Sequence, residues 1–235
     1  MLTLNKCFAI VALHTVTHNY KMRTRVLYCL AALAAGAASS LAQSNVYSLN
    51  IVGYVTYTQQ ASKFNIIANP LNTTNNDVSN VFSSAAQYPG LTVYKRNSGG
   101  GYDQSTFDPD LTAWTAPLDV SPGTGVWLST PPGTTFTNTF VGEVTLDSTN
   151  TVEAGYSIKS SVVPQAGLLS SQLGYPVAPG DGVFVWNGNG YDIFSFDPDL
   201  SAWAPSEPSV NVAQGFWIFN SGASKPWVRH FTVGP

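Results

Sequence analysis

The sequence has few of the residue types on which most catalytic and metal sites depend. Its 235 residues include only two cysteines, Cys7 and Cys29, and of its three histidines only His230 lies beyond residue 42. This scarcity excludes a thiol nucleophile, a disulfide framework and a Cys/His zinc site from the rest of the chain. No Gly-x-Ser-x-Gly segment is present, so the sequence does not indicate a serine nucleophile elbow.

Positive charge is also scarce. Beyond residue 42 the chain has six Lys and Arg against thirteen Asp and Glu, which gives a formal charge of −7. Without a basic stripe, nucleic acid and anionic membranes are poor partners. The abundance of Ser, Thr, Asn and Gly is typical of an extracellular β-protein with a neutral polar surface.

The first 42 residues are predicted to be removed from the mature protein. A basic segment at 22–25, an apolar run from Val26 to about Leu33, and Ser40-Leu41-Ala42 before the cut together predict a signal peptide over 22–42. Residues 1–21 are interpreted as an over-extended start; the alternative is one long signal peptide. We therefore expect export to the periplasm, cell surface or medium, with no transmembrane span in the mature chain, because a span needs about 20 apolar residues.

The mature chain contains an internal repeat. Residues 107–114 return as residues 196–203, and only the exchange of Thr112 for Ser201 separates the two copies. The flanking segments repeat as well, namely 101–103 with 190–192, and 125–127 with 215–217. Such a repeat defines the architecture before any site is considered, because a motif kept in both copies is typical of the fold itself.

Each copy predicts about 90 residues of short antiparallel strands and one short helix. Alternating apolar residues and turn signals every 8 to 12 residues favour a mainly β sandwich or barrel-like fold. Helices are expected at 78–86 and at 165–173. The expected division is 43–144 for the first repeat and 145–235 for the second, either as two closely packed lobes or as one pseudo-symmetric unit.

The repeated Phe-Asp-Pro-Asp-Leu segment has two interpretations. The favoured one is a type I turn, in which the first Asp side chain accepts backbone amides and Leu111 and Trp114 pack into the core. The alternative is a calcium site, since two carboxylates one residue apart can converge on a hard cation. Its ligands would be Asp108 and Asp110 in the first copy, and Asp197 and Asp199 in the second.

Aromatic residues supply the candidate binding surface, because Trp and Tyr rings can stack on sugar rings. The candidates are Tyr102, Trp114, Trp127, Trp186, Tyr191, Trp203 and Trp217. The duplicated tryptophans 114, 203, 127 and 217 lie in apolar contexts and are expected in the core. The unduplicated Trp186, opposite Arg96 in the first copy, and Trp227 are favoured for a surface role. We take Trp186, Trp227, Tyr102 and Tyr191 as the binding candidates.

Catalysis finds little support. A glycoside hydrolase needs only two carboxylates about 5 to 10 Å apart. Glu143, Glu153 and Glu207 are the only glutamates, and the sequence singles out none of them. No catalytic residue and no cofactor is assigned, apart from the calcium alternative.

Segment 46–55, directly after the signal peptide, resembles the mature N-terminus of a family of uncharacterised exported proteins of environmental Gram-negative bacteria. Segments 64–72 and 215–217 are similar to the next motifs of that family, which carry no known activity. The leading hypothesis is a non-enzymatic envelope or extracellular protein that self-associates or binds other surface components through the β-prone segment 46–58. The alternative is a carbohydrate-binding module, and the third is a hydrolase.

Overall fold

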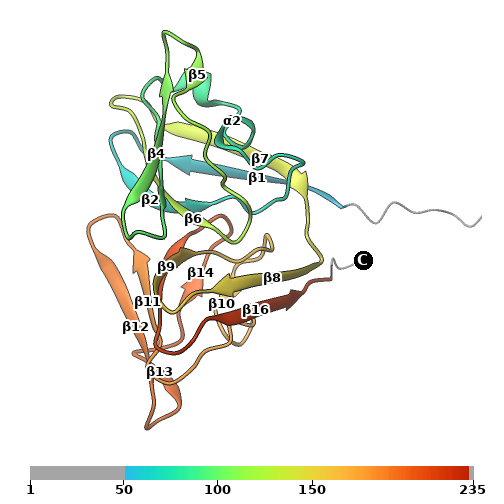
Figure 1. Ribbon diagram of the computed structural model, residues 1–235, viewed down its shortest axis with the longest axis vertical. Coiled ribbons are helices and arrows are strands. Elements are labelled where there is room, and N and C mark those ends of the chain that lie inside the picture. Colours follow the sequence, from blue (N-terminus) through green and yellow to red (C-terminus); the bar gives the residue numbers. More distant parts are fainter. Residues whose placement is uncertain (1–50, 233–235) are drawn as a thin grey trace, which may run out of the picture. The chain divides into compact units, whose positions relative to one another are not determined.

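Alternation of apolar and polar residues produces two five-stranded antiparallel sheets, one from each copy of the repeat (Figure 1). The computed structural model describes residues 51–232. The predicted over-extended start 1–21 and signal peptide 22–42 lie outside these residues, as do the first five residues of segment 46–58. The described residues belong to a single compact unit, Asn50–Pro235. The prediction of a mainly β, sandwich-like fold is confirmed.

The first sheet is covered on one face by a two-stranded ribbon and a short helix. Its strands, in spatial order, are β2 (Phe64–Ala68), β6 (Gly125–Ser129), β3 (Thr92–Arg96), β4 (Tyr102–Asp108) and β5 (Ala113–Trp114). The covering elements are β1 (Val52–Gln59), β7 (Phe136–Glu143), α2 (Val78–Val81) and the 3₁₀ turn η1 (Ala85–Gln87). Strands β1 and β7 pair antiparallel along their whole length.

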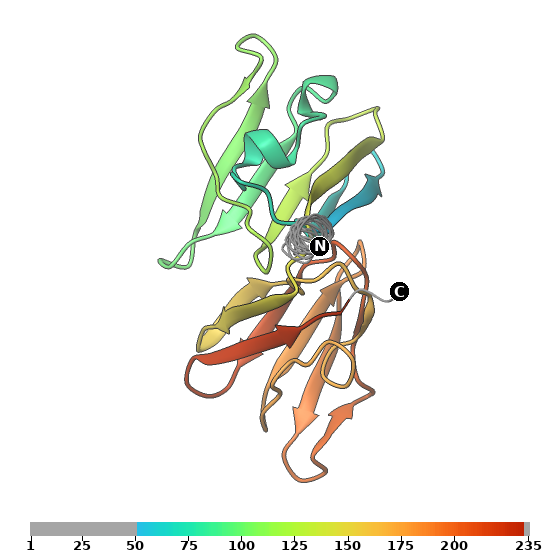
Figure 2. The ribbon, with the colours of Figure 1, turned by 90° about the vertical axis from the view of Figure 1, so that its right-hand side faces the viewer.

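The second sheet repeats this plan. Its strands, in spatial order, are β13 (Ala202–Ala204), β12 (Tyr191–Asp197), β11 (Gly182–Trp186), β15 (Phe216–Asn220) and β9 (Gly155–Lys159). The covering ribbon consists of β8 (Asp147–Val152) and β16 (Lys225–His230), and a short pair joins β10 (Gly167–Leu168) to β14 (Ser209–Val210). Figure 2 shows the blue-to-yellow-green strands in one group and the yellow-to-red strands in the other.

Each sheet buries one face in its own hydrophobic core. In the first half Val93 and Leu128 are fully buried against Phe136 and Phe140 of β7. In the second half Val183 and Ile218 are fully buried against Trp227 of β16. Successive side chains of a strand point to opposite faces, so the intervening residues lie on the uncovered face of each sheet. That face carries the candidate site.

The two predicted helices have different outcomes. Asp77 caps α2 by accepting the Ser79 amide, as expected, but the helix is only one turn long before η1 follows. The helix expected at 165–173 is wrong. Gly167 has φ near 158°, β10 pairs with β14 there, and Glu207 accepts the amides of Ser170 and Ser171. This carboxylate, distant in sequence, stabilises turns where the local pattern favoured a helix.

The Phe-Asp-Pro-Asp-Leu turn prediction agrees with the geometry. Oδ1 of Asp108 accepts the amides of Asp110 and Leu111, and Asp197 makes the same two bonds in the second copy. Thr112 and Ser201 then take positive φ values of 49° and 48°. Leu111 is 69% exposed, so the expectation that it packs into the core is wrong.

A buried ion pair lies at one end of the second core. Asp181 is completely buried and accepts bonds from the hydroxyl of Tyr175, the amides of Ala178 and Ser221, and Nζ of Lys225. Burial alone would raise the pKa of Asp181, but these donors and the lysine charge outweigh it and hold the pKa below its ordinary value. The carboxylate is therefore ionised in the folded protein.

The repeated glycines Gly125 and Gly215 explain how the two sheets meet. The Gly215 amide donates to the carbonyl of Ile66 at 3.1 Å, and the Ala68 amide donates to Ala213. A β-carbon on Gly215 would lie 2.7 Å from Cγ2 of Ile66, and one on Gly125 would lie 2.5 Å from Cγ2 of Ile158. Only glycine permits this approach, and the contact buries both isoleucines on the otherwise uncovered faces.

Candidate functional site: two aromatic pockets

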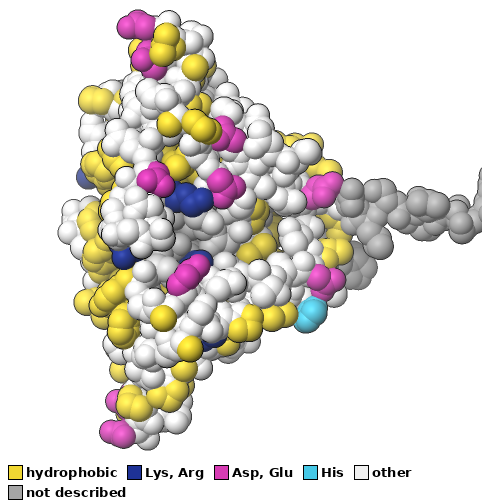
Figure 3. Space-filling model, viewed as in Figure 1, with side chains coloured by type: hydrophobic (Ala, Val, Ile, Leu, Met, Phe, Trp, Pro, Cys, Tyr) yellow, Lys and Arg dark blue, Asp and Glu magenta, His cyan; other side chains and the backbone are white. Residues whose placement is uncertain are grey.

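The uncovered faces of both sheets are lined with aromatic side chains. Phe64 on the edge strand β2 is 52% exposed, and Tyr156 on the edge strand β9 is 53% exposed. Trp127 and Trp217 lie half-buried on the same faces, so the expectation that they belong to the core is wrong. Figure 3 shows hydrophobic side chains along the left-hand edge of the view, over β11 and β12. A contiguous aromatic surface of this kind is the candidate functional site, because soluble proteins seldom leave large apolar patches exposed.

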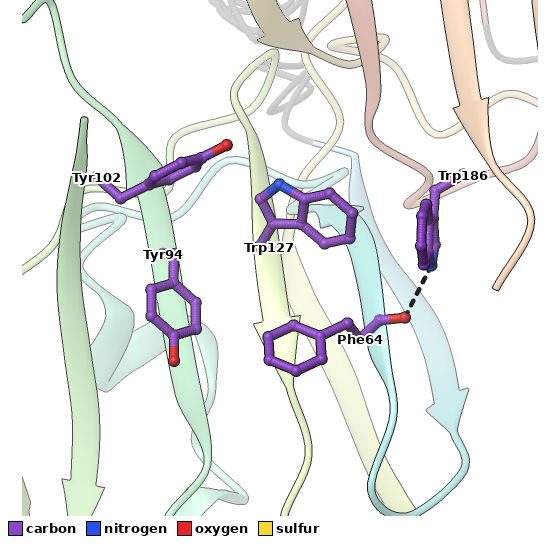
Figure 4. Close-up of a pocket in the computed structure, with 5 residues that line it drawn as sticks. All are labelled: Phe64, Tyr94, Tyr102, Trp127 and Trp186. Carbon is purple, nitrogen blue, oxygen red and sulfur yellow. Dashed lines mark hydrogen bonds between the residues drawn. The ribbon is translucent and has the colours of Figure 1, made fainter. Parts of the chain in front are cut away.

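The first pocket has a volume of about 460 Å³ and is open to solvent. It is lined by Phe64, Tyr94, Tyr102, Trp127 and Trp186 (Figure 4). The Phe64 and Tyr94 rings are tilted by only 32° to each other, with centroids 6.3 Å apart. The Trp127 ring stands at 74° to Phe64, so the rings form the floor and wall of a cup. This volume lies within the range of small-molecule sites, about 300 to 1,000 Å³.

The second pocket has a volume of about 350 Å³. It is lined by Arg96, Tyr156, Phe184, Tyr191 and Trp217. The Tyr156 ring is tilted by 44° to Phe184 and stands at 80° to Trp217. Its floor and wall therefore have the same arrangement as those of the first pocket.

Strand register shows that the two pockets are equivalent. Tyr94 is paired with Trp127 as Phe184 is paired with Trp217, because β3–β6 corresponds to β11–β15. The hairpin pair Arg96–Tyr102 corresponds in the same way to Trp186–Tyr191. Phe64 and Tyr156 correspond too, because Ile66 pairs with Trp127 as Ile158 pairs with Trp217. The repeat thus supplies four equivalent aromatic positions to each pocket.

The fifth residue of each pocket comes from the other half of the chain. Trp186 packs edge-on against Trp127 with centroids 5.2 Å apart, and its Nε1 donates to the carbonyl of Phe64 at 3.0 Å (Figure 4). At the equivalent position Arg96 lies over the Trp217 ring, 5.2 Å from its centroid. The two pockets therefore exchange equivalent residues, and neither is complete without the other half.

Polar atoms surround these aromatic walls. The hydroxyls of Tyr94 and Tyr102 and the indole N–H of Trp127 make no hydrogen bond to any residue in the range 51–232. Partial burial raises the pKa of Tyr191 above its ordinary value, and the nearby Tyr102 adds to this shift. The Tyr191 hydroxyl is therefore a neutral donor and acceptor at physiological pH. The pockets can stack an apolar ring face and hydrogen-bond its edge.

The structure places three of the four binding candidates in these pockets. Trp186 and Tyr102 line the first pocket, and Tyr191 lines the second. The fourth, Trp227, is 1% exposed in the second core, where its Nε1 donates to the Leu173 carbonyl. Its assignment to the surface is wrong, because strand β16 covers the sheet and needs a large apolar side chain there.

Two of the remaining tryptophans pack against the cores, whereas four other aromatic residues line the pockets. Trp114 and Trp203 pack against the two cores, as predicted. Phe64, Tyr94, Tyr156 and Phe184 were not selected from the sequence, although they line the pockets. The available signal was the period of two for Tyr94, Tyr156 and Phe184, since each lies next to a buried residue on its strand.

The three glutamates considered for catalysis lie outside both pockets. Glu207 accepts backbone amides, and Glu153 pairs with Lys159 at 2.9 Å. Glu143 lies on the β7 ribbon. Neither pocket is lined by an acidic residue or a histidine. In the part of the chain that the structure describes, no three His, Cys, Asp or Glu residues are grouped as metal ligands, and the two Asp-Pro-Asp turns are no exception.

Comparisons with known protein families, with characterised proteins and with solved structures find no match to this chain. Between residues 51 and 232 no helix is long and apolar enough to cross a membrane. Functional inference therefore rests on the pockets themselves.

Proposed function

We propose that the protein is an exported, non-catalytic binding protein whose two aromatic pockets hold sugar residues of an extracellular polysaccharide. The observation that carries the proposal is the pair of equivalent, solvent-open aromatic pockets. Burial of aromatic side chains stabilises a fold, so leaving these rings exposed in both halves has a stability cost. A binding role explains why the rings remain exposed in both halves.

The chemistry of the pockets suits a pyranose ring. The ring's C–H groups form an apolar face that can pack on the tilted Phe64 and Tyr94 rings or on Tyr156 and Phe184. Its hydroxyls can then bond to polar atoms at the edges, such as the Trp127 indole N–H. A purely apolar ligand would leave these polar groups without partners.

The residues that line the pockets favour binding over hydrolysis. Glycoside hydrolysis needs an acid and a second carboxylate on either side of the scissile bond. The only ionisable groups in the two linings are tyrosine hydroxyls and the Arg96 guanidinium. These groups can orient a sugar but supply neither the acid nor the nucleophile.

Two sites on one chain also favour a polymeric ligand. When one residue of a polysaccharide occupies the first pocket, a second residue reaches the other pocket at high effective concentration. Weak single-pocket binding would then give measurable affinity for the polymer. Short oligosaccharides should bind more weakly than long ones.

The test is affinity electrophoresis and calorimetry against a panel of neutral and acidic polysaccharides. Trp186→Ala removes one wall of the first pocket, so we expect at least a fivefold loss of affinity for a bound glycan with little change in fold. The matched control is Tyr54→Ala, because Tyr54 is 72% exposed on β1 and lies in neither pocket. Absence of binding to every glycan at millimolar concentration would refute the proposal.

Strand β1 supports a second candidate, self-association. The strand contains no proline or charged residue, and one of its edges pairs with no described strand. Val52 and Tyr54 are 55% and 72% exposed on its outer face. An edge without charge or proline is open to pairing with another chain.

A further inference from the structure

The two pockets differ in charge at their exchanged position. The first pocket receives the neutral Trp186, and the second receives the cationic Arg96, although both occupy equivalent places in the hairpins. The other four positions remain aromatic in both pockets. The repeat therefore provides an internal comparison in which one substitution separates a neutral site from a charged one.

Arg96 has no acidic partner in the region 51–232. The ion pairs there join Lys95 to Asp119, Lys159 to Glu153 and Lys225 to Asp181, and the His230 ring contacts Asp147. Arg96 instead donates from Nη1 to the Gly100 carbonyl at 3.0 Å and stacks on Trp217. A guanidinium has five N–H donors, so one backbone bond leaves most of them for a ligand.

The surroundings of Arg96 restrict the class of ligand that it can bind. It is half-buried at the wall of a pocket whose other linings are aromatic, in a mature chain of net negative charge. Partial desolvation strengthens a charge-assisted hydrogen bond to an anion compared with one in open solvent. A ligand that stacks on Tyr156 or Trp217 can therefore present an anionic substituent to Arg96.

We propose that the second pocket selects a sugar ring bearing an anionic group, a carboxylate or a sulfate ester, whereas the first pocket takes a neutral ring. The inference rests on the proposed carbohydrate-binding function and assigns its ligand class. It implies that the natural polymer contains both acidic and neutral residues. The guanidinium fork would bind either anion with two parallel hydrogen bonds.

The experiment measures calorimetric binding of three probes, namely tetragalacturonate, a sulfated κ-carrageenan tetrasaccharide and the neutral cellotetraose. We expect Arg96→Gln to weaken binding of the acidic probe about tenfold, the usual scale for one charge-assisted bond, and to weaken binding of cellotetraose, which needs no cation, far less. The matched control is Lys95→Gln, which removes the same charge one residue away, where it pairs with Asp119 at 2.9 Å. The two acidic probes distinguish a carboxylate from a sulfate.

A second variant tests the proposal by changing the ligand preference of the pocket, so the test does not depend only on weakened binding. Arg96→Trp gives the second pocket the residue type of the first, so the preference for acidic probes should disappear while neutral binding is kept or strengthened. Acidic binding of the wild type should also weaken several-fold between about 0.05 and about 0.5 M NaCl. Thermal melting of each variant establishes that the fold is intact.

The outcomes separate this inference from the proposed function. If neutral glycans bind and acidic ones do not, or if Arg96→Gln weakens both equally, the charge assignment is overturned and carbohydrate binding stands. If none of the probes and no polysaccharide of the panel binds, both are overturned. If Lys95→Gln has the same effect as Arg96→Gln, general electrostatic attraction replaces the assigned contact.

Discussion

Replacing Gly215 by alanine places a methyl group at the contact between the two sheets. The new β-carbon would lie 2.7 Å from Cγ2 of Ile66, 2.9 Å from the carbonyl oxygen of Ile67 and 3.2 Å from the α-carbon of Gly125. Two of these three atoms belong to the backbone and cannot move alone. The strand cannot withdraw without lengthening the bond from the Gly215 amide to the Ile66 carbonyl.

The expected cost follows from these contacts. Overpacking a tight contact costs about 1 to 3 kcal/mol, and weakening one backbone hydrogen bond adds about 1 kcal/mol. Gly215→Ala should therefore reduce the free energy of unfolding by about 2 to 4 kcal/mol. For a unit of this size that corresponds to a fall in Tm of roughly 5 to 15 °C.

The assay is thermal unfolding followed by circular dichroism, with Gly222→Ala as the matched control. A β-carbon at Gly222 would have only Asn220 Oδ1 within reach, at 3.9 Å, so this variant should melt within about 2 °C of the wild type. The junction also brings Trp186 and Arg96 across to the opposite pockets, so Gly215→Ala should weaken glycan binding too. Equal melting of both variants would refute the argument that the glycines exist for close approach of the sheets.

Two further predictions concern the buried ion pair and the free strand edge. Asp181→Asn should lower the free energy of unfolding by about 3 kcal/mol at pH 7, since it leaves Lys225 without its buried partner. The pKa of Asp181 is lower in the folded than in the unfolded state. The stability difference between wild type and variant should therefore be complete above the unfolded-state pKa and disappear as the pH falls through the folded-state pKa. A stability difference that stays constant in urea titrations at different pH values would contradict this argument. If β1 mediates self-association, deleting residues 43–54 should reduce assembly seen by light scattering, and Tyr54→Lys should do the same without truncation. A strictly monomeric wild type at high concentration would remove that candidate.

The sequence predicted much of the fold because its signals are local. Strand β11, for example, is a short apolar run between two turn segments, which is a local signal for a strand in a mainly β fold. The repeat also predicted that both halves share one plan. The helix at 165–173 failed because Glu207, more than thirty residues away, caps the turns there. No local pattern carries that information.

The site was predicted only in part for a related reason. The absence of a duplicate points to Trp186, and ring chemistry alone points to Tyr102 and Tyr191. The apolar context of Trp127 and Trp217 predicts the core, because such a context does not distinguish the two faces of a sheet. Trp227 has no counterpart in the first copy, which favours a functional role but carries no information about burial. Exposure depends on which face the ribbons cover, and this is determined by pairing distant in sequence.

The most direct test of the proposed function uses the six tryptophans as internal reporters in a nitrogen–proton NMR titration of the indole N–H signals. Trp127, Trp186 and Trp217 line the pockets, whereas Trp114, Trp203 and Trp227 pack against or within the cores. On addition of a bound oligosaccharide, the account predicts that the first three signals shift and saturate while the other three stay in place. Shifts confined to the core tryptophans, or no shift with any glycan that the protein retains, would contradict it.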